Sequence, residues 1–217
     1  MNHIVRLIAV TCLALGAVSC SHTGIGSADL GHRGPHVVRS IQQDASGTTL
    51  PVPFVAQPAY SNWCWAASGE MISAFLGERV EASQQVDERF DRLGMNAKSK
   101  RDTEFKKHVL GGWPELDRFG FDHDFSRAPL SWERINTELS VRKRPLAWAY
   151  GRGAQIGHMV VVVGCKTTPS GKRYLYTQNP NGSGSLDRIS YESYSRSAGY
   201  GRHLRTYFNF QRDGQGA

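Results

Sequence analysis

The pattern of apolar and polar residues divides the chain into a helical first half and a second half rich in strands. From Trp65 to Leu76 apolar residues recur at helical spacing, which predicts a helix that begins at or just after position 64. Two further helices are expected, one capped by Ser83 and one that starts at Ser131. From Arg144 the helical pattern gives way to one typical of strands.

The second half of the chain is typical of β-strands. Strands are predicted at residues 145–150, 157–165, 173–177 and 205–210. The second of these is the most pronounced, because His158 is followed by Met159 and four valines. Helices followed by strands, without regular alternation, indicate an α+β fold. The adjacent residues Asp122, His123 and Asp124 are of types that bind metals, but three neighbouring side chains do not converge easily on one ion, so a polar loop is expected there.

The first 49 residues differ from the rest and are expected to lie outside the folded domain, which we place at residues 50–213. Residues 1–19 resemble a signal peptide, with Arg6 before an apolar run that is short for a membrane span. The run ends at Cys20 in a sequence similar to a bacterial lipobox, which predicts lipidation of Cys20; a plain secretory signal is the alternative. Residues 20–49, rich in Gly, Ser and His, predict a flexible tether.

Composition limits the classes of protein to consider. With 217 residues, 40% hydrophobic and 10% aromatic, the chain suits one ordinary globular domain. It has 26 basic and 19 acidic residues, a formal charge of +7, which favours attraction to anionic surfaces. No basic helix or aromatic-basic motif indicates a nucleic-acid partner. We therefore expect no nucleic acid, and membrane contact only through a lipid at Cys20.

Cys64 is the candidate nucleophile. At the N-terminus of a helix, unpaired N–H groups and the helix dipole stabilise a thiolate, so a lowered pKa is expected. Gln57 lies a short loop upstream and can present its side-chain amide to the sulfur. The small residues 66–69 after Cys64 allow another layer to approach closely. The alternative is a buried structural thiol, which is the more common role of a lone cysteine.

A thiol nucleophile requires a base, and His158 is the best placed of the eight histidines because it opens the buried strand. The alternative for His158 is a structural histidine at a strand end. Asn179 follows a strand and precedes Pro180, where it can orient the imidazole or simply form a turn. Gln178 and Asn181 are the fallback candidates for the orienting residue.

Two segments resemble those of the papain-like cysteine proteases: Asn62-Trp-Cys-Trp-Ala-Ala-Ser68 and the strand Gly157-His-Met-Val-Val-Val-Val-Gly164. The resemblance is to the compact bacterial branch in particular, which includes the avirulence-type proteases of plant pathogens. The resemblance implies a cysteine helix packed on an antiparallel sheet. It also implies a Cys64–His158–Asn179 triad with Gln57 in the oxyanion hole, and no cofactor. Asn62 and Trp63 stand where the plant enzymes have a cysteine and a glycine.

These features predict an exported cysteine peptidase that cleaves protein or peptide substrates through a thioester and is lipid-anchored in the cell envelope or secreted. The same triad would also serve a peptidoglycan amidase or an acyltransferase. A catalytically idle surface-binding module is a third alternative. The second cysteine of the domain, Cys165, is expected on the strand face opposite His158, with a raised pKa and no disulfide to Cys64.

Overall fold

The structure, a computed structural model, describes residues 47–95, 112–152, 156–196 and 201–214. The chain divides into two compact units, residues 1–34 and 35–217, and every described residue belongs to the second. The predicted signal peptide, Cys20 and residues 20–46 of the predicted tether lie outside the described residues.

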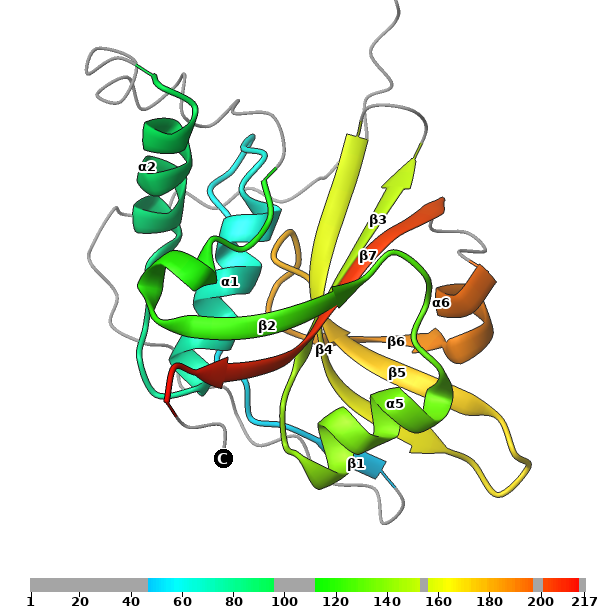
Figure 1. Ribbon diagram of the computed structural model, residues 1–217. Coiled ribbons are helices and arrows are strands. Elements are labelled where there is room, and N and C mark those ends of the chain that lie inside the picture. Colours follow the sequence, from blue (N-terminus) through cyan, green and yellow to red (C-terminus); the bar gives the residue numbers. More distant parts are fainter. Residues whose placement is uncertain (1–46, 96–111, 153–155, 197–200, 215–217) are drawn as a thin grey trace, which may run out of the picture. The chain divides into compact units, whose positions relative to one another are not determined.

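A seven-stranded antiparallel sheet organises the described part of the chain (Figure 1). The strand order is β2-β7-β3-β4-β5-β6, and the short β1 pairs separately with the far end of β4. The strands are β1 (Gly47–Thr49), β2 (Phe121–Ser126), β3 (Leu146–Arg152), β4 (Ile156–Thr167), β5 (Arg173–Gln178), β6 (Leu186–Ser190) and β7 (Arg202–Arg212). The predicted α+β class with an antiparallel sheet is confirmed.

Three strands were not predicted, and each has a local reason. β1 consists of the last three residues of the predicted tether, where pairing with β4 decides the conformation. β2 contains Asp122–Asp124, so the expected polar loop was wrong; β2 is the outermost strand, and an edge strand tolerates charged side chains. β6 pairs with β5 and has little apolar pattern of its own.

Helices were predicted correctly after Cys64, after Ser83 and after Ser131, whereas α6 (Tyr191–Arg196) was not predicted. The helices of the described part of the chain are α1 (Cys64–Phe75), α2 (Ala82–Arg92), a 3-10 turn (Leu116–Phe119), α5 (Trp132–Asn136), which is continued by a π-helical turn η2 (Thr137–Val141), and α6 (Tyr191–Arg196). Ser131 caps α5 by accepting a hydrogen bond from the backbone of Arg134. The predicted cap of α2 was wrong: Glu81, not Ser83, is the N-cap, and it forms a capping box with Gln84.

Helix α1 contacts both β4 and α2 (Figure 1). Its first ten residues are all buried, so the helix is enclosed on every side instead of on the single face that the periodicity predicted. The small residues permit this. A Cβ atom on Gly69 would lie 2.2 Å from Oε1 of Gln85, whose Nε2 donates to the carbonyl of Ala66 at 3.0 Å. The predicted close approach of another layer is thus supplied by α2.

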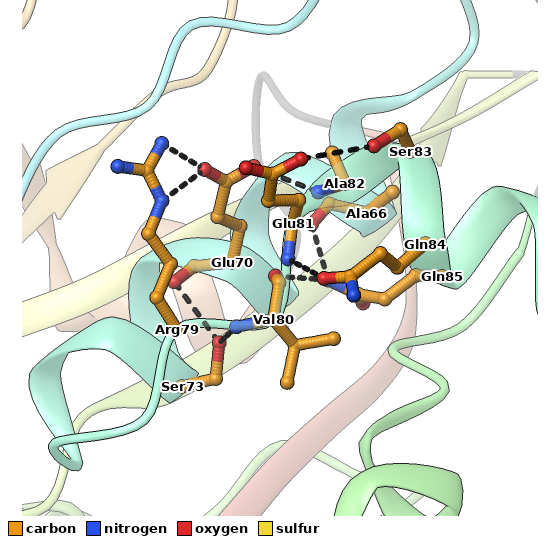
Figure 2. A network of polar contacts seen from close by, with 10 residues as sticks. All are labelled: Ala66, Glu70, Ser73, Arg79, Val80, Glu81, Ala82, Ser83, Gln84 and Gln85. Atoms are coloured by element: carbon orange, nitrogen blue, oxygen red, sulfur yellow. Dashed lines mark hydrogen bonds and ion pairs between the residues drawn. The ribbon is translucent and has the colours of Figure 1, made fainter. Parts of the chain in front are cut away.

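A buried carboxylate joins α1 to the start of α2 (Figure 2). Glu70, 4% exposed, accepts a hydrogen bond from the backbone amide of Ala82 at 2.7 Å and pairs with Arg79. Ser73 adds a second link, since its hydroxyl accepts from the amide of Val80 at 3.0 Å. A buried charge needs such partners, and here they hold the helix that carries Cys64 in one position.

The apolar core lies between the helices and the sheet. Its largest fully buried side chains include Trp65, Trp148, Tyr194, Phe90, Phe121 and Phe210. Among the described residues, none of the helices has both the length and the apolar character needed to cross a membrane.

Candidate active site

Cys64 is the first residue of α1, and its side chain is 8% exposed. Burial raises the pKa of the Cys64 thiol, while hydrogen bonds from the backbone amides of Met159, Trp65 and Cys64 itself act in the opposite direction. The expected helix-terminal stabilisation is therefore present, but the predicted lowering of the pKa was wrong. Removal of the sulfur from water outweighs the local amide donors and sets the direction of the shift.

His158 lies near the start of β4, directly opposite Tyr150 of β3. The two rings meet edge to face with their centroids 5.6 Å apart. Nε2 of His158 lies 2.8 Å from Oδ1 of Asn179. The imidazole is thus held by an aromatic ring and by an amide, and the predicted pairing of His158 with Asn179 is present in the structure.

Asn179 follows the last residue of β5 and begins a turn closed by Gly182, whose amide donates to the Asn179 carbonyl at 2.7 Å. The backbone amide of Asn181 donates to Oδ1 of Asn179 at 3.0 Å. The atom that faces His158 is therefore an oxygen acceptor, and Nε2 of His158 carries a proton. In the neutral imidazole this leaves Nδ1 unprotonated and able to accept a proton.

Gln57 lies beside this turn. Its backbone amide donates to the carbonyl of Pro180 at 3.0 Å, and its Nε2 donates to the carbonyl of Ser61 at 2.8 Å. Oε1 of Gln57 is buried and has no hydrogen-bond partner among the described residues. One proton of the Gln57 amide is thus used within the loop that leads to Cys64, and the other has no partner among the described residues.

Contacts near the end of β5 link the four predicted residues Cys64, His158, Asn179 and Gln57, and several of these contacts are made by backbone groups. The pairing of β4 with β5 ends at Val161 and Gln178, so Met159 lies beyond the part of β4 that pairs with β5, although it still pairs with Ala149 of β3. Its backbone amide donates to the Cys64 thiol. His158 is the preceding residue and contacts Asn179, whose neighbour Pro180 accepts from Gln57. The Met159 amide, the Tyr150 ring and the Pro180 carbonyl have no pattern in the sequence that would have indicated them.

The remaining candidates have structural roles. Gln178 is buried and donates to the carbonyl of Val52 at 2.8 Å, which joins β5 to the segment before Cys64. Asn181 contributes its backbone amide to Asn179. His123 packs between the rings of Tyr207 and Phe210, with centroids at 5.3 and 5.4 Å. Within the described ranges, no three His, Cys, Asp or Glu side chains lie close enough to bind a metal ion.

Cys165 lies in different surroundings from Cys64. Its sulfur is 3.7 Å from both the Ser140 hydroxyl and Oδ1 of Asn136, and burial raises its pKa. Both cysteines are free, so the prediction that they form no disulfide is confirmed. The strand register shifts between Val162 and Gly164 in the pairing with β5, so residue parity alone does not assign the face of Cys165.

A thiol at a helix start, bonded to the amide of the residue that follows a histidine held by an asparagine, is an arrangement suited to nucleophilic catalysis on carbonyl groups. The model of the Peptidase_C39 like family matches residues 49–202, which is more than half of the chain. The chain therefore belongs to the Peptidase_C39 like family, and its class is that of the cysteine peptidases, which are hydrolases.

Two solved structures give the scale of the structural likeness. The ragweed pollen allergen Amb a 11, a cysteine protease crystallised in its proform, is similar with a TM-score of 0.47 and 12% identity over 82% of this chain and 62% of that one. This chain thus spans less than two thirds of the length of that protease. The bromelain protease from Ananas comosus, in complex with the E64 inhibitor, has a TM-score of 0.40 and 16% identity over 75% of this chain and 94% of that one. Comparison with curated protein sequences gave no match.

Proposed function

We propose that the protein hydrolyses peptide bonds through a thioester, with Cys64 as nucleophile, His158 as acid and base, Asn179 as the residue that orients His158, and Gln57 as an oxyanion donor. The observation that carries the proposal is the 2.8 Å contact between Nε2 of His158 and Oδ1 of Asn179. His158 directly precedes Met159, whose backbone amide donates to the Cys64 thiol. The proposal includes a papain-like arrangement of the site, and its closer likeness to the avirulence-type branch stays a prediction.

The proposed chemistry requires the Cys64 thiol to lose its proton, and burial, which raises the pKa of Cys64, makes a base necessary for this step. Nδ1 of His158 takes the thiol proton as the sulfur attacks the carbonyl carbon of the substrate. The tetrahedral intermediate then collapses, the C–N bond breaks, and the imidazolium returns its proton to the leaving amine. Water, deprotonated by the same imidazole, attacks the thioester and releases the carboxylic acid and the free thiol.

The oxyanion of the intermediate needs donors at the position where the charge develops. The first N–H groups of a helix have no partner within the helix, so the amides of Cys64 and Trp65, which donate to the sulfur in the free protein, could donate to the oxyanion once the sulfur is bonded to the substrate carbon. The second proton of Gln57 Nε2 adds a side-chain donor, and the bond to Ser61 limits how far that amide can rotate. Together they would stabilise the intermediate as the thiol proton leaves.

Three variants test the assignment against labelled casein. Cys64→Ala removes the nucleophile and His158→Ala removes the base, so each should reduce kcat/KM by at least about 1000-fold. Asn179→Ala should cost about 10- to 100-fold, because Asn179 orients the imidazole and does not react. Cys165→Ala is the matched control and should retain activity. Near wild-type turnover by Cys64→Ala or His158→Ala would refute the assignment.

The location of the protein is part of the proposal. We propose that it is exported and anchored in the cell envelope through a lipid on Cys20, with the positive charge favouring contact with anionic surfaces. Intact-mass measurement of the mature protein tests this: a diacylglyceryl-modified Cys20 terminus is expected, and Cys20→Ser should abolish it. An unmodified terminus at Cys20 or Ser21 would leave plain secretion as the explanation.

A further inference from the structure

Tyr60 lies in the loop between Gln57 and Cys64, and 94% of its surface is exposed. Within the described part of the chain, its ring has no aromatic contact and its hydroxyl has no hydrogen bond. A large aromatic side chain without contacts contributes little to folding. Tyr60 lies between two residues of the proposed catalytic machinery, where its exposed ring is accessible to a bound ligand.

The backbone conformation at position 60 is unfavourable for a tyrosine. Its φ is +57°, in the left-handed region that favours Gly or Asn. The amide of Ser61 donates to the carbonyl of Pro58 at 3.2 Å, which makes Tyr60 the third residue of a β-turn, the position where Gly or Asn is usual for positive φ. The Ser61 hydroxyl also donates to the Pro58 carbonyl, at 2.7 Å, so the turn is held by groups other than the tyrosine ring.

The two ends of this loop are fixed at the site. Gln57 is bonded through its amide to Pro180, the neighbour of Asn179, and through its side chain to Ser61. Cys64 begins α1. Tyr60 is the exposed aromatic side chain on the loop that joins Gln57 to Cys64, four residues before the proposed nucleophile.

We propose that Tyr60 is a specificity residue, whose ring covers an apolar side chain of the substrate next to the scissile bond. The proposal rests on the proposed peptidase function. Substrate binding would bury the face of a tyrosine that is otherwise almost fully in water, and contact between an aromatic ring and an apolar side chain is favourable. The strained backbone is tolerated because the ring acts in substrate binding and not in folding.

The experiment measures stability and binding in the same variants. Tyr60→Gly removes the ring and relieves the backbone, and Tyr60→Asn removes the ring while tolerating positive φ. The matched control is Lys143→Gly, because Lys143 is also exposed, has φ +55°, and lies between η2 and β3. The probes are two fluorescein-labelled twelve-residue peptides, one with Leu on both sides of the central bond and its twin with Ser there. Binding is measured by anisotropy in a Cys64→Ala background, so that it does not depend on turnover.

Tyr60→Gly should raise the melting temperature by about 2–4 °C while it weakens binding of the Leu peptide about 10-fold. Tyr60→Asn should weaken binding of the Leu peptide to the same extent. Lys143→Gly should raise the melting temperature similarly and leave binding unchanged. The Ser peptide should bind the protein that retains Tyr60 about 10-fold more weakly than the Leu peptide, and the loss in Tyr60→Gly should be small for the Ser peptide.

Equal affinity of the Tyr60→Gly variant and its parent for the Leu peptide, or no preference of the parent for Leu over Ser, would overturn the proposal. Equal weakening by Lys143→Gly would also overturn it, since the effect would then come from the backbone. Failure of the peptidase function would be seen separately. The protein that retains Cys64 would then leave the Leu peptide uncut, while the differences in binding between the Tyr60 variants and their parent would persist in the Cys64→Ala background.

Discussion

His203 gives the most quantitative prediction, because its contacts and its pKa lead to the same expectation. Nδ1 of His203 accepts a hydrogen bond from the indole nitrogen of the fully buried Trp148 at 3.2 Å, and its Nε2 lies 3.5 Å from the Thr206 hydroxyl. Protonation at Nδ1 would replace the acceptor with a second donor and break the bond from Trp148. Burial lowers the pKa of His203 from 6.5 to about 4.

The sign follows from linkage. A histidine whose pKa is lower in the folded protein binds its proton first in the unfolded chain, so stability is lost as the pH falls from about 6.5 toward 4. Above that window the residue is neutral in both states and contributes no pH dependence. The full shift corresponds to about 2 kcal/mol at pH 5. Because His203 is only partly buried, we reduce this value by half, to about 1 kcal/mol of unfolding free energy.

The assay is urea unfolding followed by tryptophan fluorescence at pH 7.5, 6.0 and 5.0, with His203→Asn as the comparison. Asparagine keeps an oxygen acceptor near the position of Nδ1 and does not titrate. The unfolding free energy of the wild type should fall relative to that of His203→Asn by about 1 kcal/mol between pH 7.5 and pH 5.0. His123, whose pKa burial also lowers, is present in both proteins, so its contribution cancels. Parallel pH profiles for the two proteins would show that the environment of His203 does not disfavour its protonation.

Two further predictions concern the nucleophile and its helix. Burial raises the pKa of both Cys64 and Cys165, so iodoacetamide at pH 7 should modify Cys64 faster than Cys165 only because His158 takes the proton of Cys64. The ratio of the two modification rates, measured by peptide mapping, should therefore fall toward one in His158→Ala. An unchanged ratio would contradict this role of His158. Gly69→Ala should destabilise the protein by about 1–2 kcal/mol in urea unfolding, because a Cβ atom would displace the buried Gln85 amide from its two carbonyl acceptors. The penalty should disappear in a Gln85→Ala background, and its persistence there would place the clash elsewhere.

Local pattern was sufficient for much of the fold and for the choice of candidate residues. The apolar spacing after Cys64, the Ser131 cap and the valine run after His158 predicted α1, α5 and β4 correctly, because helical spacing, capping and β-propensity are visible in the local sequence. The chemistry of thiol, imidazole and amide is likewise a property of residue type. Cys64, His158, Asn179 and Gln57 could therefore be selected without coordinates.

Tertiary structure decided what depends on residues far apart in the chain. β1 exists only through its pairing with β4, and β6 through its pairing with β5. The direction of the Cys64 pKa shift was predicted wrongly, because the helix terminus is a local feature, whereas desolvation comes from every layer packed around the sulfur. The tautomer of His158 depends on a turn 21 residues away, whose own hydrogen bond makes Oδ1 of Asn179 the facing atom. Residue type determined which groups could react, and packing across the sheet determined their protonation and their orientation.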